Sequence, residues 1–128
     1  MCGIFGIINY SNSLNLKDDL KSLAKQMHHR GPDDESYFID GHVGIGMKRL
    51  SIIDLTTGNQ PFFSSDSKVI LVLNGEIYNY KKLKIDLIKK GYKFRSDSDV
   101  EVLVFLYEEY GLDCIKYING MFSFALVD

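Results

Sequence analysis

Cysteine is scarce in this chain, whose 128 residues contain only Cys2 and Cys114. Two cysteines so far apart make neither a disulfide framework nor the four-ligand spacing of a structural zinc site. Long apolar runs are also lacking, since none approaches the ~20 residues needed to cross a bilayer. The N-terminus has no positively charged segment leading into a long apolar stretch, so no signal peptide is indicated. These absences are typical of a protein of the reducing cytoplasm.

Charge of either sign is not in excess, because the formal net charge is −2. Without a basic cluster, a general nucleic-acid surface is not indicated. Hydrophobic residues make up 45% and charged residues 25% of the chain, which are ordinary values for a globular protein. The sequence has no internal repeat, low-complexity segment or linker, and its length suits a single domain with a real core.

Cys2 stands directly behind the initiator methionine. Methionine before a small residue is normally removed, and its removal would leave Cys2 with a thiol and a free α-amino group. A thiolate is a strong nucleophile, and a terminal amine with a pKa near 8 moves protons at neutral pH, so one residue would supply a catalytic pair. The alternative is a cysteine present by chance, because free cysteine is usually a small buried hydrophobe. Cys114, among apolar neighbours, is interpreted as such a core residue.

The periodicity of the apolar residues predicts strands and helices in mixed order. Because regular alternation of strand, helix and strand is missing, the α+β class is favoured over a doubly wound α/β sheet. The predicted strands are 4–8, 37–39, 43–48, 69–73 and 121–127, with a short apolar segment at 51–55 and a loop at 57–61. Helices are predicted from Leu16 to about His28, over 80–88 with Gly91 as the stop, from a capping box at Ser98 and Glu101, and briefly over 114–118.

The strand over 69–73 leads into Asn74, Gly75 and Glu76. An asparagine amide and a glycine N–H are suitable donors for a tetrahedral oxyanion, although Asn-Gly is also the commonest tight-turn pair. Arg49 could bind a carboxylate through its planar fork or be an ordinary surface cation. Asp99 would lie in the first turn of its helix, where the dipole alone favours a carboxylate. The three histidines lack a carboxylate at metal-ligand spacing, so no metal site is predicted.

These residues belong to an ordered series of motifs that together resemble the class II glutamine amidotransferase domain, in the version at the N-terminus of glutamine-hydrolysing asparagine synthetases. The similarity extends over essentially all of the chain. The motifs are residues 1–6, 29–33, 49–54, 60–61, 74–79, 98–101 and 119–122.

The resemblance implies an N-terminal nucleophile hydrolase that converts L-glutamine to glutamate and ammonia. Its expected fold is a four-layer αββα sandwich of two antiparallel sheets. The implied nucleophile is Cys2, with its own α-amino group as proton shuttle. Asn74 and Gly75 would form the oxyanion hole, Arg49 would hold the substrate carboxylate, and Glu76 and Asp99 would hold its ammonium group. The loop over 30–33 would shape the pocket.

The same resemblance predicts a single glutaminase domain over 1–128 that lacks its last strands, with the synthetase domain absent. No cofactor is expected in this domain, because ATP and magnesium would belong to the synthetase domain or subunit that receives the ammonia. A membrane or nucleic-acid partner is not expected, and an exposed sheet edge leaves a homodimer open. The alternatives are an ammonia donor for a sugar or peptide acceptor, and a non-catalytic remnant that serves as a binding or assembly module.

Overall fold

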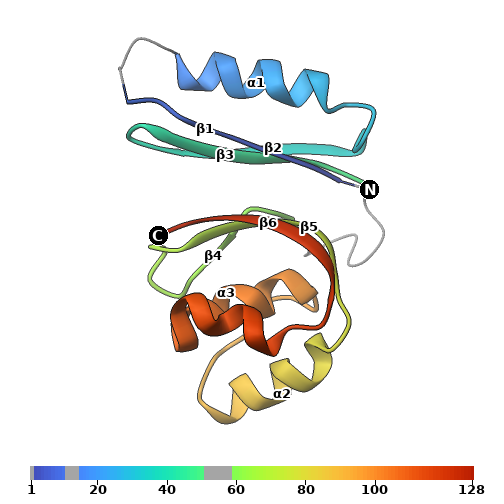
Figure 1. The fold of residues 1–128 in the computed structure, drawn as a ribbon, viewed down its shortest axis with the longest axis vertical. Coiled ribbons are helices and arrows are strands. Elements are labelled where there is room, and N and C mark those ends of the chain that lie inside the picture. Colours follow the sequence, from blue (N-terminus) through green and yellow to red (C-terminus); the bar gives the residue numbers. More distant parts are fainter. Residues whose placement is uncertain (1, 11–14, 51–58) are drawn as a thin grey trace. The chain divides into compact units, whose positions relative to one another are not determined.

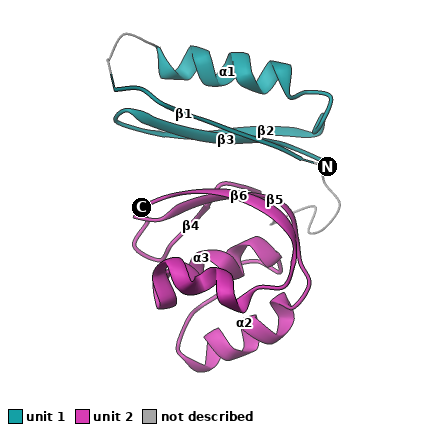
Figure 2. Ribbon diagram, in the orientation of Figure 1, with its two compact units in different colours: residues 1–51 teal, residues 52–128 magenta. Residues whose placement is uncertain are grey.

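A computed structural model describes residues 2–10, 15–50 and 59–128, which fall into two compact units (Figure 2). Unit 1 comprises residues 1–51 and unit 2 comprises residues 52–128. Each unit is a three-stranded antiparallel sheet with its own helical cover. The apolar segment predicted over 51–55 lies outside the described residues, as do positions 57 and 58 of the predicted loop.

Unit 1 is one helix packed on a three-stranded sheet (Figure 1). Its sheet has the order β1-β3-β2, with β3 antiparallel to both neighbours, so the central strand is the last of the three in sequence. The predicted strands and helix are all present, and β2 is longer than expected. The elements are β1 (Gly3–Ile8), α1 (Leu16–Gln26), β2 (Asp34–Asp40) and β3 (Val43–Arg49).

Helix α1 lies close to its sheet because β3 has no side chain where the two cross. Leu20 and Ala24 are fully buried on the inner face of the helix, against Phe5 of β1. A Cβ on Gly44 would lie 2.6 Å from Leu20 Cδ1. Gly44 therefore leaves space for the Leu20 side chain. The apolar residues at helical spacing in the sequence form the core of this unit.

Unit 2 has the strand order β4-β5-β6, with helices packed against one face of the sheet (Figure 1). Its central strand β5 is antiparallel to both neighbours. Each helix and strand predicted in this half is found. The elements are β4 (Phe62–Phe63), β5 (Ile70–Ile77), α2 (Tyr80–Lys89), α3 (Asp99–Tyr110), the 3-10 helix η1 (Gly111–Tyr117) and β6 (Gly120–Val127).

The core of unit 2 is built around α3, which is buried along most of its length. Leu103 and Leu106 of this helix pack with Leu71 and Leu73 of β5. Cys114 is only 2% exposed in the same cluster, so its interpretation as a core residue is confirmed. Burial raises the pKa of its thiol, which keeps the sulfur protonated and unreactive.

Asn74 and Gly75 are not a tight turn. Strand β5 continues through both residues to Ile77, and Asn74 pairs with Ser123 of β6. The strand predicted over 69–73 is therefore four residues too short at its C-terminal end. The cause is non-local: β6 lies far away in the sequence and supplies a partner for every residue of this segment.

The predicted capping box at the start of α3 is half right. Ser98 is the N-cap, and its side chain accepts a hydrogen bond from Val100 N at 3.2 Å. Glu101 does not reach back to Ser98 N, which donates instead to Ser96 Oγ. The Glu101 carboxylate accepts from the backbone N–H groups of Arg95 and Ser96, in the loop that precedes the helix.

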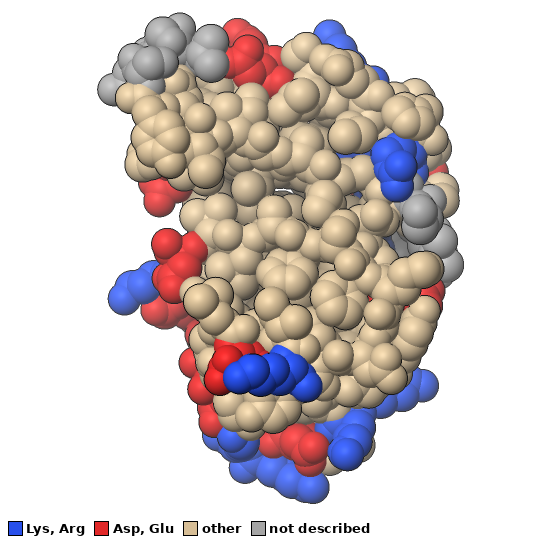
Figure 3. Space-filling view, in the orientation of Figure 1, with Lys and Arg blue, Asp and Glu red and all other residues tan. Residues whose placement is uncertain are grey.

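The α+β class and the two antiparallel sheets are thus confirmed. Over the described ranges, the structure contains no helix that is both long and apolar enough to span a membrane. On the face drawn in Figure 3, side chains of both charge signs are interspersed around the α2 end of unit 2. Lys84 with Asp97 and Lys89 with Asp86 are ion pairs of this region.

Candidate active site

Cys2 lies at the beginning of β1, beside the end of β3. Its Sγ is 3.3 Å from the backbone N of Leu50, which donates to it, and 3.6 Å from the Leu50 carbonyl oxygen. The residue is half-buried and forms no disulfide. An N–H aimed at sulfur is the kind of donor that stabilises a thiolate. The role of the Leu50 N–H could not be predicted, because a backbone donor leaves no trace in residue type.

Arg49 is the last residue of β3 and therefore lies at the same end of the sheet as Cys2. It stands opposite Asp34 of β2 and is only 6% exposed. The surface-cation alternative for this residue is wrong. A buried guanidinium needs polar partners, and such a group is suited to a planar carboxylate.

The loop over 30–33 packs against this same end of unit 1. Arg30 Nε donates to the Cys2 carbonyl oxygen at 3.2 Å, and Asp33 N donates to the Arg49 carbonyl oxygen at 3.0 Å. Gly31 lies so near the backbone of Lys48 that a Cβ would collide with its carbonyl. The loop thereby holds the main-chain carbonyls of both the cysteine and the arginine.

In unit 2, Asn74 and Glu76 occupy neighbouring positions on one face of β5. Leu73 and Ile77 point into the helix-side core, so the two-residue period of the strand turns Asn74 and Glu76 to the opposite face. Gly75 between them has φ +136°, and a Cβ there would collide with the Met121 carbonyl. Only glycine fits, so its backbone is uncovered by any side chain of its own.

Asp99 is the first residue of α3 and contacts β5 at Ile77, the residue that follows Glu76. Its Oδ2 accepts a hydrogen bond from Ile77 N at 2.7 Å, and the residue is 7% exposed. Burial raises the pKa of this carboxyl, and the negative charge of Glu76 adds to the effect. Unit 2 therefore brings together the two carboxylates that the sequence singled out, next to Asn74 and Gly75.

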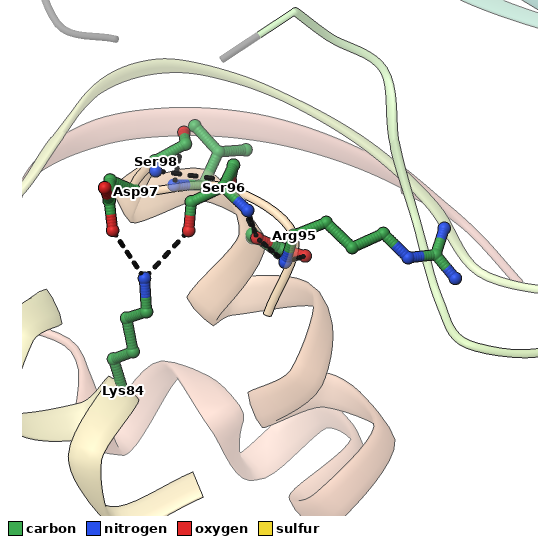
Figure 4. A network of polar contacts seen from close by, with 7 residues as sticks. Lys84, Arg95, Ser96, Asp97 and Ser98 are labelled. Carbon is green, nitrogen blue, oxygen red and sulfur yellow. Dashed lines mark hydrogen bonds and ion pairs between the residues drawn. The ribbon is translucent and has the colours of Figure 1, made fainter. Parts of the chain in front are cut away.

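Asp97, two residues before Asp99, has a side chain that is 95% exposed and forms an ion pair with Lys84. Figure 4 shows Lys84 of α2 reaching the loop before α3, where its Nζ is 2.8 Å from Asp97 Oδ1 and 2.8 Å from the Ser96 carbonyl oxygen. The Arg95 side chain extends away from this network (Figure 4). The loop is thus held by Lys84 from one side and by Glu101 from the other, which fixes where Asp99 begins the helix.

The described part of the chain contains no cluster of three or more histidine, cysteine or carboxylate side chains that could hold a metal ion. His28, His29 and His42 are all exposed. The chemistry available at the sites above is nucleophilic and electrostatic: a thiol, a cation, two carboxylates and amide donors.

Comparison with known proteins identifies the class. Residues 1–128 match the family described as a glutamine amidotransferase domain, and the chain belongs to this family. The resemblance seen in the sequence is thereby confirmed.

Among curated proteins, the chain is 47% identical to asparagine synthetase [glutamine-hydrolyzing] 2 of Bacillus subtilis, over all of this chain and 17% of that protein. It is 40% identical to asparagine synthetase [glutamine-hydrolyzing] 1 of Arabidopsis thaliana, over all of this chain and 22% of that protein. The chain therefore spans about a fifth of the length of these relatives.

Two solved structures are similar to it at 26% identity, each over 70% of this chain and 22% of the other. One is described as the allosteric regulatory enzyme of purine biosynthesis, with a TM-score of 0.56. The other is glutamine phosphoribosylpyrophosphate amidotransferase from B. subtilis complexed with ADP and GMP, with a TM-score of 0.53. Both likenesses agree with the α+β fold described above.

Proposed function

We propose that residues 1–128 act as one glutaminase domain, which hydrolyses L-glutamine to L-glutamate and ammonia. The observation that carries this proposal is the placement of Cys2. In a chain that belongs to the glutamine amidotransferase family, its thiol receives the Leu50 N–H and lies at the same sheet end as the buried Arg49.

In the proposed reaction the Cys2 sulfur attacks the side-chain amide carbon of glutamine. The carbonyl oxygen becomes an oxyanion, and the Asn74 side chain and the Gly75 N–H donate to it. The α-amino group of Cys2, free once methionine is removed, takes the thiol proton and passes it to the departing ammonia. The γ-glutamyl thioester is then hydrolysed by water, which releases glutamate and restores the thiol.

The proposed recognition of glutamine uses charge at its amino-acid end. Arg49 pairs with the α-carboxylate, and Glu76 and Asp99 pair with the α-ammonium group. Two charges held at one end orient the uncharged amide for attack, so that binding energy is converted into positioning. The nearness of Asp99 to Glu76 supports the second half of this assignment. Asp99 accepts a hydrogen bond from the N–H of Ile77, the residue that follows Glu76, and the charge of Glu76 helps to raise the pKa of Asp99.

We further propose asparagine synthesis as the use of the ammonia. The support is the whole-chain similarity to glutamine-hydrolysing asparagine synthetases. In such a protein a following domain would use ATP and magnesium to activate aspartate. A protein that contains this chain, given amide-labelled glutamine, ATP and aspartate, should form labelled asparagine. Label that reaches a sugar or peptide instead would replace this acceptor and leave the glutaminase assignment intact.

Glutamate release from glutamine tests the glutaminase assignment. We expect Cys2→Ala to abolish it, because no other residue supplies the thiol and the amine together. The matched control is Cys114→Ala, which removes the buried cysteine and should leave kcat unchanged within a factor of about two, since this thiol is not a nucleophile. Equal activity of the Cys2→Ala variant and the wild-type chain would contradict the assignment and favour the non-catalytic alternative.

A further inference from the structure

Gln60 binds the backbone of the residue that precedes Asn74. Its Oε1 accepts from Leu73 N at 2.6 Å, and its Nε2 donates to the Leu73 carbonyl oxygen at 3.0 Å. Both residues are buried, at 9% and 1% exposure. One side-chain amide therefore takes up the donor and the acceptor of a single strand residue, as a neighbouring strand would.

The reason is found in the pairing of β4 with β5. Phe62 pairs with Leu71. Continuing this antiparallel register by two residues places Gln60 opposite Leu73. The intervening residue is Pro61, which has no N–H to donate to a ladder. The Gln60 side chain thus continues the sheet edge where the regular pairing of β4 has ended.

The same edge is bound again at the other end of the candidate site. Asp99 accepts from Ile77 N, whereas β6 pairs with Asn74, Gly75 and Glu76 along the opposite edge. Asn74 and Gly75 consequently lie between two side-chain contacts to the strand, one from Gln60 and one from Asp99. The two-residue period of the strand predicts the Gly75 N–H on the same edge as those of Leu73 and Ile77.

We propose that Gln60 is a positioning residue for glutamine hydrolysis. By fixing the Leu73 backbone, it holds the Asn74 amide and the Gly75 N–H in the positions that they need as oxyanion donors. This inference rests on the proposed glutaminase function. Gln60 acts through its neighbour and contacts no substrate. Oxyanion donors work only at their correct distance from the developing charge, so a small displacement of β5 at Leu73 lowers the rate of the chemical step more than it weakens glutamine binding.

The first test replaces the amide by an apolar side chain of similar length. Gln60→Met leaves the buried N–H and carbonyl of Leu73 without this partner, and we expect kcat for glutamate release to fall roughly 10- to 100-fold with KM changed less than about threefold. The matched control is Ser64→Ala, at the far end of the same edge. Ser64 is 1% exposed and its Oγ accepts from Val69 N at 2.9 Å, so this variant also loses a buried contact to the backbone, away from Asn74. Its kcat should remain within a factor of about two of wild type.

The second test is a double-mutant cycle with Asn74→Ala, which alone should lower kcat by about 10²–10³. If Gln60 acts through Asn74, Gln60→Met should cost a much smaller factor in the Asn74→Ala background than in the wild type. The same factor in both backgrounds, or an equal loss of kcat in Ser64→Ala, would show a merely structural role and overturn the proposal.

If Gln60→Met does not fold, as judged by thermal unfolding, Gln60→Glu takes its place in the cycle. Glutamate keeps the shape and the acceptor for Leu73 N but, when ionised, has no donor for the Leu73 carbonyl. Its kcat should also fall, and a wild-type kcat would overturn the proposal. A wild-type chain that releases no glutamate would refute the glutaminase function itself, which is a separate outcome.

Discussion

At the scale of single residues, Asp99 shows how one carboxylate has both a structural and a proposed binding role. It begins α3, accepts from Ile77 N, and is buried beside the charge of Glu76. The N–H donor favours its ionised form, whereas burial and the like charge oppose it, and the pKa is raised on balance. An ammonium group placed between the two carboxylates would relieve this repulsion, which is why the pair suits the amino end of glutamine.

The raised pKa of Asp99 predicts a pH dependence of stability. The folded chain binds this proton more tightly than the unfolded chain, whose Asp pKa is about 3.9. The stability that Asp99 contributes is therefore fully present below about pH 3.9 and is lost as the pH rises through the folded pKa. Asp99→Asn keeps an acceptor for Ile77 N but does not titrate.

The measurement is urea unfolding of both forms over a pH series. The free energy of unfolding of wild type minus that of Asp99→Asn should decrease as the pH rises from about 4, and level off once the folded pKa is passed. A difference that is flat over this range, or that increases with pH, would contradict the burial of Asp99 as the dominant cause.

At the scale of elements, the start of α3 depends on a carboxylate that holds the preceding loop. Glu101 is 3% exposed and accepts from Arg95 N, Ser96 N and Ser96 Oγ at 2.9, 2.9 and 2.7 Å. The sequence pattern correctly indicated the cap at Ser98, because capping residues have a local signature. It did not indicate the true partners of Glu101, because the loop before the helix has no periodicity from which its path could be read.

We expect Glu101→Ala to destabilise unit 2 more than Ser98→Ala does. Loss of the carboxylate leaves buried donors of the loop without their acceptor, at a cost of about 1–3 kcal/mol for each such group. Loss of the Ser98 cap removes one acceptor at a cost of about 1 kcal/mol. Chemical denaturation of the two variants measures both changes. An equal or smaller loss in Glu101→Ala would mean that the loop does not depend on this side chain.

Only the first part of strand β5 could be predicted from the sequence. A continuous apolar run rich in β-branched residues correctly indicated a strand up to Leu73. Asn74 and Gly75 then resembled a turn, because that pair favours turn angles locally. The structure keeps both in the strand, since pairing with β6 supplies partners and Gly75 adopts φ +136° against Met121. Long-range pairing overrides a local preference here, and no short window of sequence contains that information.

At the scale of the whole molecule, the ordered motifs indicated the family, and the match over residues 1–128 confirms it. The residues with side-chain chemistry could be named in advance because thiol, guanidinium and carboxylate groups are visible in the sequence. The supporting contacts could not. Leu50 acts through its backbone, and Gln60 and Arg30 bind main-chain atoms of residues that are distant in the sequence.

The central claim is that Cys2, after removal of the methionine, is the nucleophile of a site that binds glutamine. The most direct measurement is the intact mass of the purified chain before and after treatment with 6-diazo-5-oxo-L-norleucine, a glutamine analogue whose diazo carbon alkylates a thiolate with loss of N₂. We predict loss of the methionine mass and one adduct, mapped to Cys2 and blocked by glutamine, while Cys114 stays unlabelled because its thiol is buried. A retained methionine, or an adduct on Cys114 in place of Cys2, would contradict the account.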